Sequence, residues 1–147
     1  MDADRIERDV LVAAPVDRVW EVLTEAKHIA GWFGESAEID LRPGGALLLG
    51  FEGHGICQAV VERVEPPHAF AFRWAYEAGI APDPGRSTVV EFTLTEEGDG
   101  TRLRVVETGF AALDVPADEQ RRRLADNTDG WRIELDELCD YAQQRAG

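Results

Sequence analysis

The spacing of apolar residues changes at Pro15, near the start of the chain. Before it, the run from Ile6 to Val12 has the character of a strand. Pro15 stands where a helix begins, a position at which its missing N–H costs nothing. After it, apolar residues follow the i, i+3, i+4, i+7 spacing of a helix, at Val16, Val19, Trp20 and Leu23. A second apolar cluster follows after a few polar residues, at Ile29, Trp32 and Phe33.

Short turns rich in proline and glycine divide the middle of the chain into runs with strand character. The turns lie at 42–45, 65–67, 82–85 and 97–100. The predicted strands are 4–12, 36–41, 46–52, 55–65, 68–76, 87–97 and 100–108. Because the last six follow one another through short links, we expect an antiparallel meander.

One face of this sheet is predicted to be apolar. In strand 68–76, aromatic residues alternate with alanine and arginine, at Phe70, Phe72, Trp74 and Tyr76. The C-terminal segment can cover this face, because it carries an apolar stripe at helical spacing. The stripe consists of Leu124, Thr128, Trp131, Leu135, Leu138 and Ala142. Gly130 interrupts this helix beside possible capping residues, so we expect a kink near 127–130 in preference to a close approach of backbone to sheet.

The composition is that of a globular protein of one domain, residues 1–147. A formal charge of −14 argues against nucleic acid and anionic membranes as partners. The N-terminus lacks an apolar export signal, and no apolar run approaches the length of a membrane span, so we expect a cytoplasmic protein. Cys57 and Cys139 form no disulfide framework and are interpreted as small, partly buried hydrophobic residues.

The ordered set of these features resembles the START-like (SRPBCC) superfamily, and within it the homologues of the activator of the heat-shock-protein-90 ATPase. The matching segments are 14–24 with 29–33, Pro43-Gly44-Gly45, 55–67, Phe72-Arg73-Trp74, Glu107-Thr108-Gly109-Phe110 and Gly130-Trp131. The resemblance implies the α+β helix-grip fold: a curved antiparallel sheet of about seven strands around a long C-terminal helix, with two short helices after the first strand. Members of the superfamily hold hydrophobic molecules between sheet and helix, and some cyclise or hydrolyse them. Co-chaperone activity is not implied, because the eukaryotic activator is similar to this chain only in its second domain.

A ligand cavity in such a fold needs apolar walls and a few polar groups. The candidate wall residues are Trp32, Phe33, Trp74, Phe92, Phe110, Trp131 and Leu135. For any single one of them, plain packing in the core is the favoured alternative.

Glu107 is the sharpest candidate for chemistry. If Leu103 and Val105 face inward, alternation turns Glu107 inward too, where it could orient a ligand or act as a general acid or base. Burial would then favour its protonated form, unless an arginine or another donor meets it. The favoured alternative is that the strand ends or bulges before Glu107, since Gly109 follows two residues later. His54 lies between two strands; a catalytic contact is possible there, but an exposed turn is favoured. His28 and His68 are expected at the surface.

We expect no metal site, because no cysteine or histidine pair has ligand spacing, and no cofactor. The leading hypothesis is a binding module, more plausibly not an enzyme, that holds a small hydrophobic molecule. The alternatives are an enzyme of the cyclase, aromatase or hydrolase type that uses Glu107 and His54, and a co-chaperone or stress-response interaction protein. A homodimer and a contact with a chaperone remain open.

Overall fold

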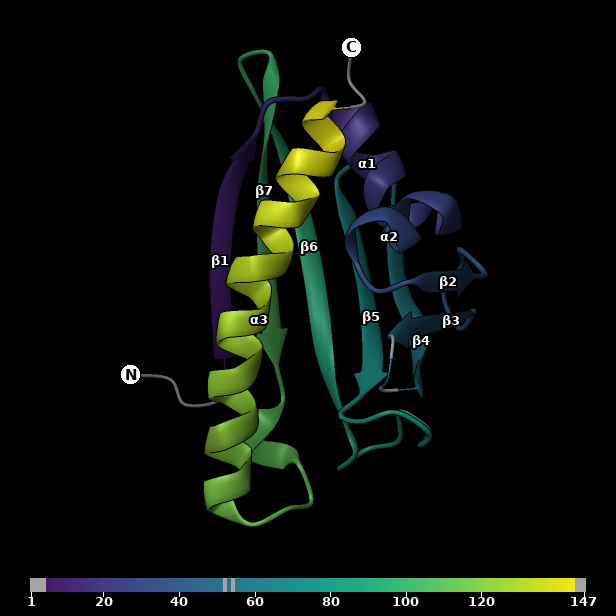
Figure 1. The fold of residues 1–147 in the computed structure, drawn as a ribbon, viewed down its shortest axis with the longest axis vertical. Helices are drawn as coiled ribbons and strands as arrows, with labels where there is room; N and C mark the ends of the chain where they lie inside the picture. The colour runs from purple at the N-terminus through teal and green to yellow at the C-terminus, as the bar shows by residue number, and fades with distance from the viewer. Residues whose placement is uncertain (1–4, 52, 54, 145–147) are drawn as a thin grey trace.

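The computed structural model describes residues 5–51, 53 and 55–144. They form one seven-stranded antiparallel sheet in the order β1-β7-β6-β5-β4-β3-β2 (Figure 1). The strands are β1 (Arg5–Val12), β2 (Ser36–Ile39), β3 (Ala46–Phe51), β4 (Gly55–Glu65), β5 (Ala69–Ala75), β6 (Ser87–Glu97) and β7 (Gly100–Thr108). The predicted meander from β2 to β7 is therefore confirmed. β1 completes the sheet by pairing with β7, from Arg5 opposite Thr108 to Val12 opposite Thr101.

The helices lie on one side of this sheet (Figure 1). Two short ones, α1 (Val16–Thr24) and α2 (Ala26–Trp32), follow the first strand. A short 3-10 helix, η1 (Phe110–Ala112), leads into the long helix α3 (Ala117–Gln144), which crosses the sheet on its β1 side. This arrangement is the helix-grip α+β fold that the sequence predicts.

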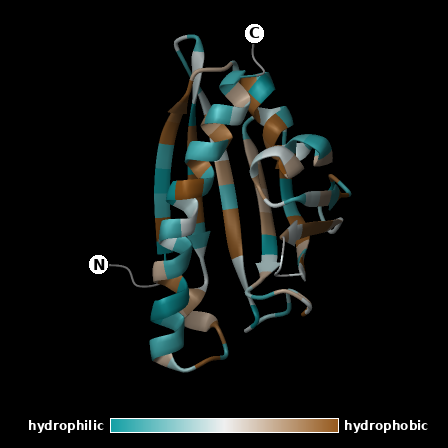
Figure 2. Ribbon diagram, in the orientation of Figure 1, coloured by the Kyte–Doolittle hydropathy of each residue, from teal (hydrophilic) through white to brown (hydrophobic). Residues whose placement is uncertain are grey.

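Alternation decides which strand residues face α3. Bands of hydrophobic and hydrophilic residues follow one another along the strands and along α3 (Figure 2). On β7, Leu103 and Val105 have no exposed surface, and neither has Glu107. The expectation that the strand ends or bulges before Glu107 is therefore wrong. β7 continues to Thr108, and its pairing with both neighbours holds the alternation to that point.

α3 buries the predicted stripe and continues without interruption through 127–130. Trp131, Leu135, Leu138 and Ala142 are buried, while Leu124 and Thr128 are partly buried. A Cβ at Gly130 would meet no atom within 4 Å, so the backbone does not approach the sheet closely there. No helix in the described part of the chain is long and apolar enough to cross a membrane.

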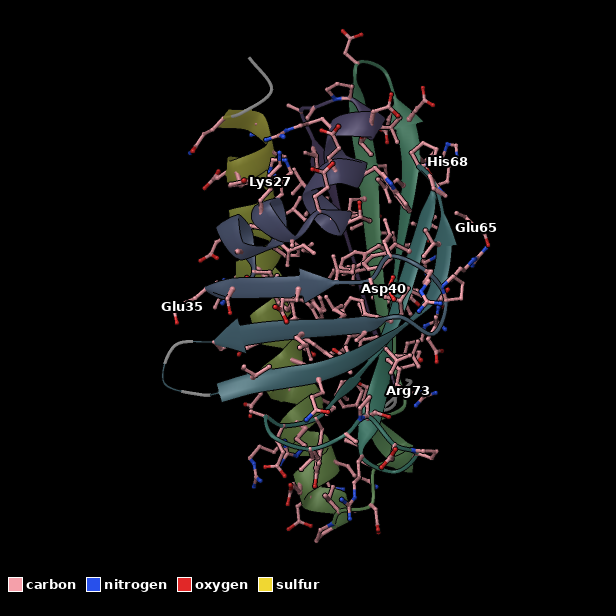
Figure 3. The ribbon with its side chains drawn as sticks, turned by 90° about the vertical axis from the view of Figure 1, so that its right-hand side faces the viewer. Lys27, Glu35, Asp40, Glu65, His68 and Arg73 are labelled. Atoms are coloured by element: carbon pink, nitrogen blue, oxygen red, sulfur yellow. The ribbon has the colours of Figure 1, made fainter. Side chains whose placement is uncertain are left out.

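The histidines differ from one another. His68 is exposed on the outer side of the sheet, as expected, and so is Glu65, while Arg73 on the same side is partly buried (Figure 3). The expectation for His28 is wrong: it is 9% exposed, because Tyr141 of α3 covers it. His28 Nδ1 and the Tyr141 hydroxyl are 2.8 Å apart, and burial lowers the pKa of His28. This contact joins α2 to the end of α3.

Replacing Gly130 with alanine is expected to raise the free energy of unfolding by about 0.5–1 kcal/mol, since glycine in a helix costs roughly that much. The new methyl group meets open space. Urea unfolding followed by circular dichroism measures the change. The control is Gly31→Ala in α2, whose Cβ would lie 2.3 Å from the Tyr141 ring and should lower stability. A loss of stability in Gly130→Ala would contradict the prediction.

Glu134 of α3 should make stability depend on pH. One of its carboxylate oxygens is buried without a hydrogen-bond partner. Burial, and secondarily Glu137, raises its pKa from 4.5 to about 7. The folded protein therefore holds this proton more tightly than the unfolded chain, and stability is lost as the pH rises from 4.5 through about 7. Glu134→Gln should raise the melting temperature more at about pH 8.5 than at about pH 5.5, unlike the exposed control Asp129→Asn. An equal effect at both pH values would refute this.

Candidate ligand pocket

The inner face of the sheet carries a carboxylate without exposed surface, that of Glu107 on β7. Its Oε2 accepts hydrogen bonds from Trp74 Nε1 at 2.9 Å and from Thr88 Oγ1 at 2.6 Å. Its Oε1 accepts one from Trp131 Nε1 at 2.8 Å. Asn127 Nδ2 lies 3.2 and 3.1 Å from the two oxygens. Four side chains from β5, β6 and α3 thus converge on one residue of β7.

All four partners donate, and this arrangement suits an ionised carboxylate, which can only accept. Among the described residues, no lysine, arginine or histidine lies within ion-pair distance of Glu107. Neutral donors therefore take the place of a counter-charge. The sequence allows for this possibility but does not identify the donors.

Register and helical spacing bring these donors together. Trp74 of β5 pairs directly with Thr88 of β6, and Val90, two residues further along β6, pairs with Glu107. Thr88 and Glu107 therefore point to the same face of the sheet. Asn127 and Trp131 are four residues apart on α3, so they share one side of the helix.

Aromatic packing closes the space beside Glu107 toward α1 and α2. Phe33 stacks on three tryptophan rings, with centroid distances of 5.0 Å to Trp32, 5.7 Å to Trp74 and 5.8 Å to Trp131. Next to this stack, Trp32, Phe33 and Phe92 border a gap of only about 10 Å³. A gap of this size lies at the lower limit for one water molecule.

A cavity of about 560 Å³ opens on the other side, between the first half of α3, η1 and the ends of β3 to β6. It reaches the surface, because exposed residues such as Glu77, Ala78 and Asp126 form part of its wall. The lining residues are Phe51, Cys57, Trp74, Ala75, Tyr76, Glu77, Ala78, Thr88, Phe110, Leu113, Arg123, Asp126 and Asn127. Three of the four donors to Glu107 therefore belong to this wall.

The family model for "Activator of Hsp90 ATPase homolog 1-like protein" (AHSA1) matches residues 13–143. The chain belongs to this family. Among solved structures, protein MLL2253 from Mesorhizobium loti has the same fold, with a TM-score of 0.80 at 24% identity over 96% of this chain and 98% of its own.

Two further structures are similar to this AHSA1-family protein. CalU16 from Micromonospora echinospora is 28% identical, with a TM-score of 0.71 over 94% of this chain and 75% of its own. DynU16, from the dynemicin biosynthetic locus, is also 28% identical, with a TM-score of 0.76 over 95% of this chain and 47% of its own. Comparison with curated proteins returned no match.

The residues predicted to bind a ligand fall into different places in this AHSA1-family fold. Trp74 and Phe110 line the cavity, and Glu107 lies behind its wall. Three others, Trp32, Phe33 and Phe92, surround the small gap, while Trp131 and Leu135 are buried in the core. Ligand contacts by these residues stay a prediction. His54 lies outside the described residues.

Thr88 and Asn127 are pocket residues that the sequence reasoning missed. Each is a polar residue in an apolar pattern, which is the signal that could have identified it. Thr88 has the inward parity of Val90 and Phe92 on β6, and Asn127 lies four residues before Trp131 on the buried side of α3. Asn127 binds Glu107 rather than capping a broken helix.

Cys57 is the one cysteine in the cavity wall, where it is buried and unpaired. Burial, and secondarily the charge of Glu107, raises the pKa of its thiol to about 11. A thiol with so high a pKa is a poor nucleophile. Cys57 therefore acts as the small apolar residue that the sequence suggests. No group of three or more metal-ligating side chains occurs among the residues that the structure describes.

Glu107→Gln is expected to lower the free energy of unfolding by about 2–3 kcal/mol, because the amide nitrogen would face donors and leave at least one of them buried without an acceptor. Urea unfolding followed by circular dichroism measures the change. The control is Glu91→Gln on the outer face of β6, where the side chain is 50% exposed, and it should change stability little. If both variants lose the same small amount, the Glu107 contacts do not hold the fold together.

Proposed function

We propose that this AHSA1-family protein binds a small hydrophobic molecule in the cavity lined by Trp74 and Phe110. The observation that carries the proposal is an aromatic-lined space of about 560 Å³ that reaches the surface, next to an aromatic cluster that leaves a gap of only about 10 Å³. Ligand sites for small molecules typically measure about 300–1,000 Å³ and combine apolar walls with a few polar groups. Here Thr88, Arg123 and Asn127 are among the polar groups.

The similar proteins support a ligand from small-molecule metabolism. DynU16 comes from the dynemicin biosynthetic locus. The family's resemblance to START-like carriers of hydrophobic molecules points the same way. Four expectations from the sequence stay predictions. They are a cytoplasmic location, a single domain, a possible homodimer and a possible contact with a chaperone.

The surroundings of Glu107 favour binding over catalysis. A general acid or base must touch the atom whose proton it moves. Both oxygens of Glu107 already accept hydrogen bonds, and the side chain has no exposed surface. Its role in this proposal is to position Trp74, Thr88 and Asn127 around the ligand.

A neutral fluorescent probe, N-phenyl-1-naphthylamine, tests the proposal. Its emission should rise on binding, and it should raise the melting temperature of the wild-type protein, because it binds only the folded state. Ala78→Trp should abolish both effects, since Ala78 is an exposed part of the cavity wall.

The matched control is Ala81→Trp, at an exposed alanine of the same loop that does not line the cavity. This variant should bind the probe like the wild type. Absence of binding to the wild type, or equal binding to both variants, would refute the proposed site.

A further inference from the structure

The hydrogen-bonding capacity of the pocket wall indicates which polar groups a ligand needs, if the proposed function holds. Two of the polar side chains in this wall, Thr88 and Trp74, already use their hydrogen-bond donors within the protein. The Thr88 hydroxyl donates to Glu107 and accepts from Trp74 Nε1, 3.0 Å away. The single N–H of Trp74 is shared between Thr88 and Glu107. Neither side chain has a donor left for a ligand.

Asn127 contributes an acceptor to the pocket. Because the Glu107 carboxylate only accepts, the amide nitrogen of Asn127 must face it, and this fixes the orientation of the whole amide group. The amide oxygen then points away from Glu107. Among the described residues, it has no hydrogen-bond partner, and Asn127 lines the cavity. A ligand would therefore meet the oxygen of this amide.

The charged groups of the wall are also acceptors. Glu77 and Asp126 line the cavity from the loop after β5 and from α3, and both are exposed. Neither forms an ion pair with another described residue. Glu107 adds a third negative charge behind the wall, close enough to contribute to the raised pKa of Cys57.

Arg123 is the one cation among the described residues of the wall, and its contacts are with the protein. Its Nη2 lies 2.7 Å from Glu119 Oε2, and its Nη1 donates to the Tyr76 carbonyl at 3.2 Å. The guanidinium also lies over the Tyr76 ring, 4.3 Å from the centroid. Glu119 balances its charge, so Arg123 offers little to an anionic ligand.

The apolar part of the wall suits a flat ring. Its aromatic side chains come from the end of β3, the end of β5 and η1, and they are Phe51, Trp74, Tyr76 and Phe110. Aromatic faces attract both flat apolar groups and cations.

We infer that the pocket selects a flat apolar molecule whose polar end is a hydrogen-bond donor, best a protonated amine, and that it discriminates against carboxylates. The inference rests on the proposed function and deepens it by naming the class of ligand. The groups that recognise the amine are the Asn127 amide oxygen and the carboxylates of Asp126 and Glu77.

Three probes with the same ring system test this inference: 2-naphthylmethylamine, which is protonated at neutral pH, the neutral 2-naphthylmethanol, and 2-naphthoate. Isothermal titration calorimetry at physiological ionic strength gives their affinities. The amine should bind at least about tenfold more tightly than the carboxylate, as one added ion pair or cation–aromatic contact allows. The alcohol should fall between them.

Matched variants distinguish the effect of a charge in the pocket from the effect of the protein's net charge on ligand affinity. Asp126→Asn should reduce the ratio of amine affinity to carboxylate affinity several-fold, because it removes a negative charge from the cavity wall. Asp118→Asn removes the same charge from an exposed position of α3 outside the cavity. Asp118→Asn should leave the ratio of amine affinity to carboxylate affinity as it is in the wild type.

The outcomes distinguish this inference from the proposed function. If the alcohol binds but the carboxylate binds as tightly as the amine or more tightly, the inference is overturned and the proposed function stands. Equal loss of preference in the two variants also overturns it, because the preference then comes from net charge. If none of the three probes binds and N-phenyl-1-naphthylamine does not bind either, both proposals fail together.

Discussion

The structure depends on a buried carboxylate, that of Glu107, which has no counter-cation among the described residues. A charge removed from water is costly unless hydrogen bonds replace its hydration. Glu107 receives them from four side chains on β5, β6 and α3. None of these donors can move far without leaving the charge unsatisfied. This requirement fixes α3 over the sheet at Asn127 and Trp131, about midway along the helix.

The fixed point at Glu107 divides the space between helix and sheet into two unequal parts. Toward α1 and α2, the stack of Phe33 with Trp32, Trp74 and Trp131 fills the interior and leaves about 10 Å³. Toward the start of α3, about 560 Å³ stays open, and Arg123 connects α3 to Tyr76 in the wall of this cavity. The hydrogen bonds of Glu107 therefore lie between a filled core and an adjoining cavity.

The two faces of the sheet use charge differently. On the outer face, arginines and glutamates pair with each other, as Arg63 does with Glu65 and Glu91. At the cavity, Glu77 and Asp126 stay unpaired among the described residues, and Glu107 lies behind them. The excess of acidic residues therefore gives the chain its net charge of −14 and also places negative charge at the cavity.

Local periodicity was sufficient to predict the strands and the covering helix, and the order of the motifs along the chain resembled that of the family. A strand such as 87–97 or the stripe from Trp131 to Ala142 is encoded in residues that lie close together in the chain. Local periodicity did not determine the direction of the Glu107 side chain, because that direction depends on the pairing of β7 with β1 and β6 up to the end of β7. The donor role of Asn127 and the position of the cavity were decided only by tertiary structure. Both arise where side chains from segments far apart in sequence meet. The residue spacing within one segment does not determine the volume that remains between such side chains.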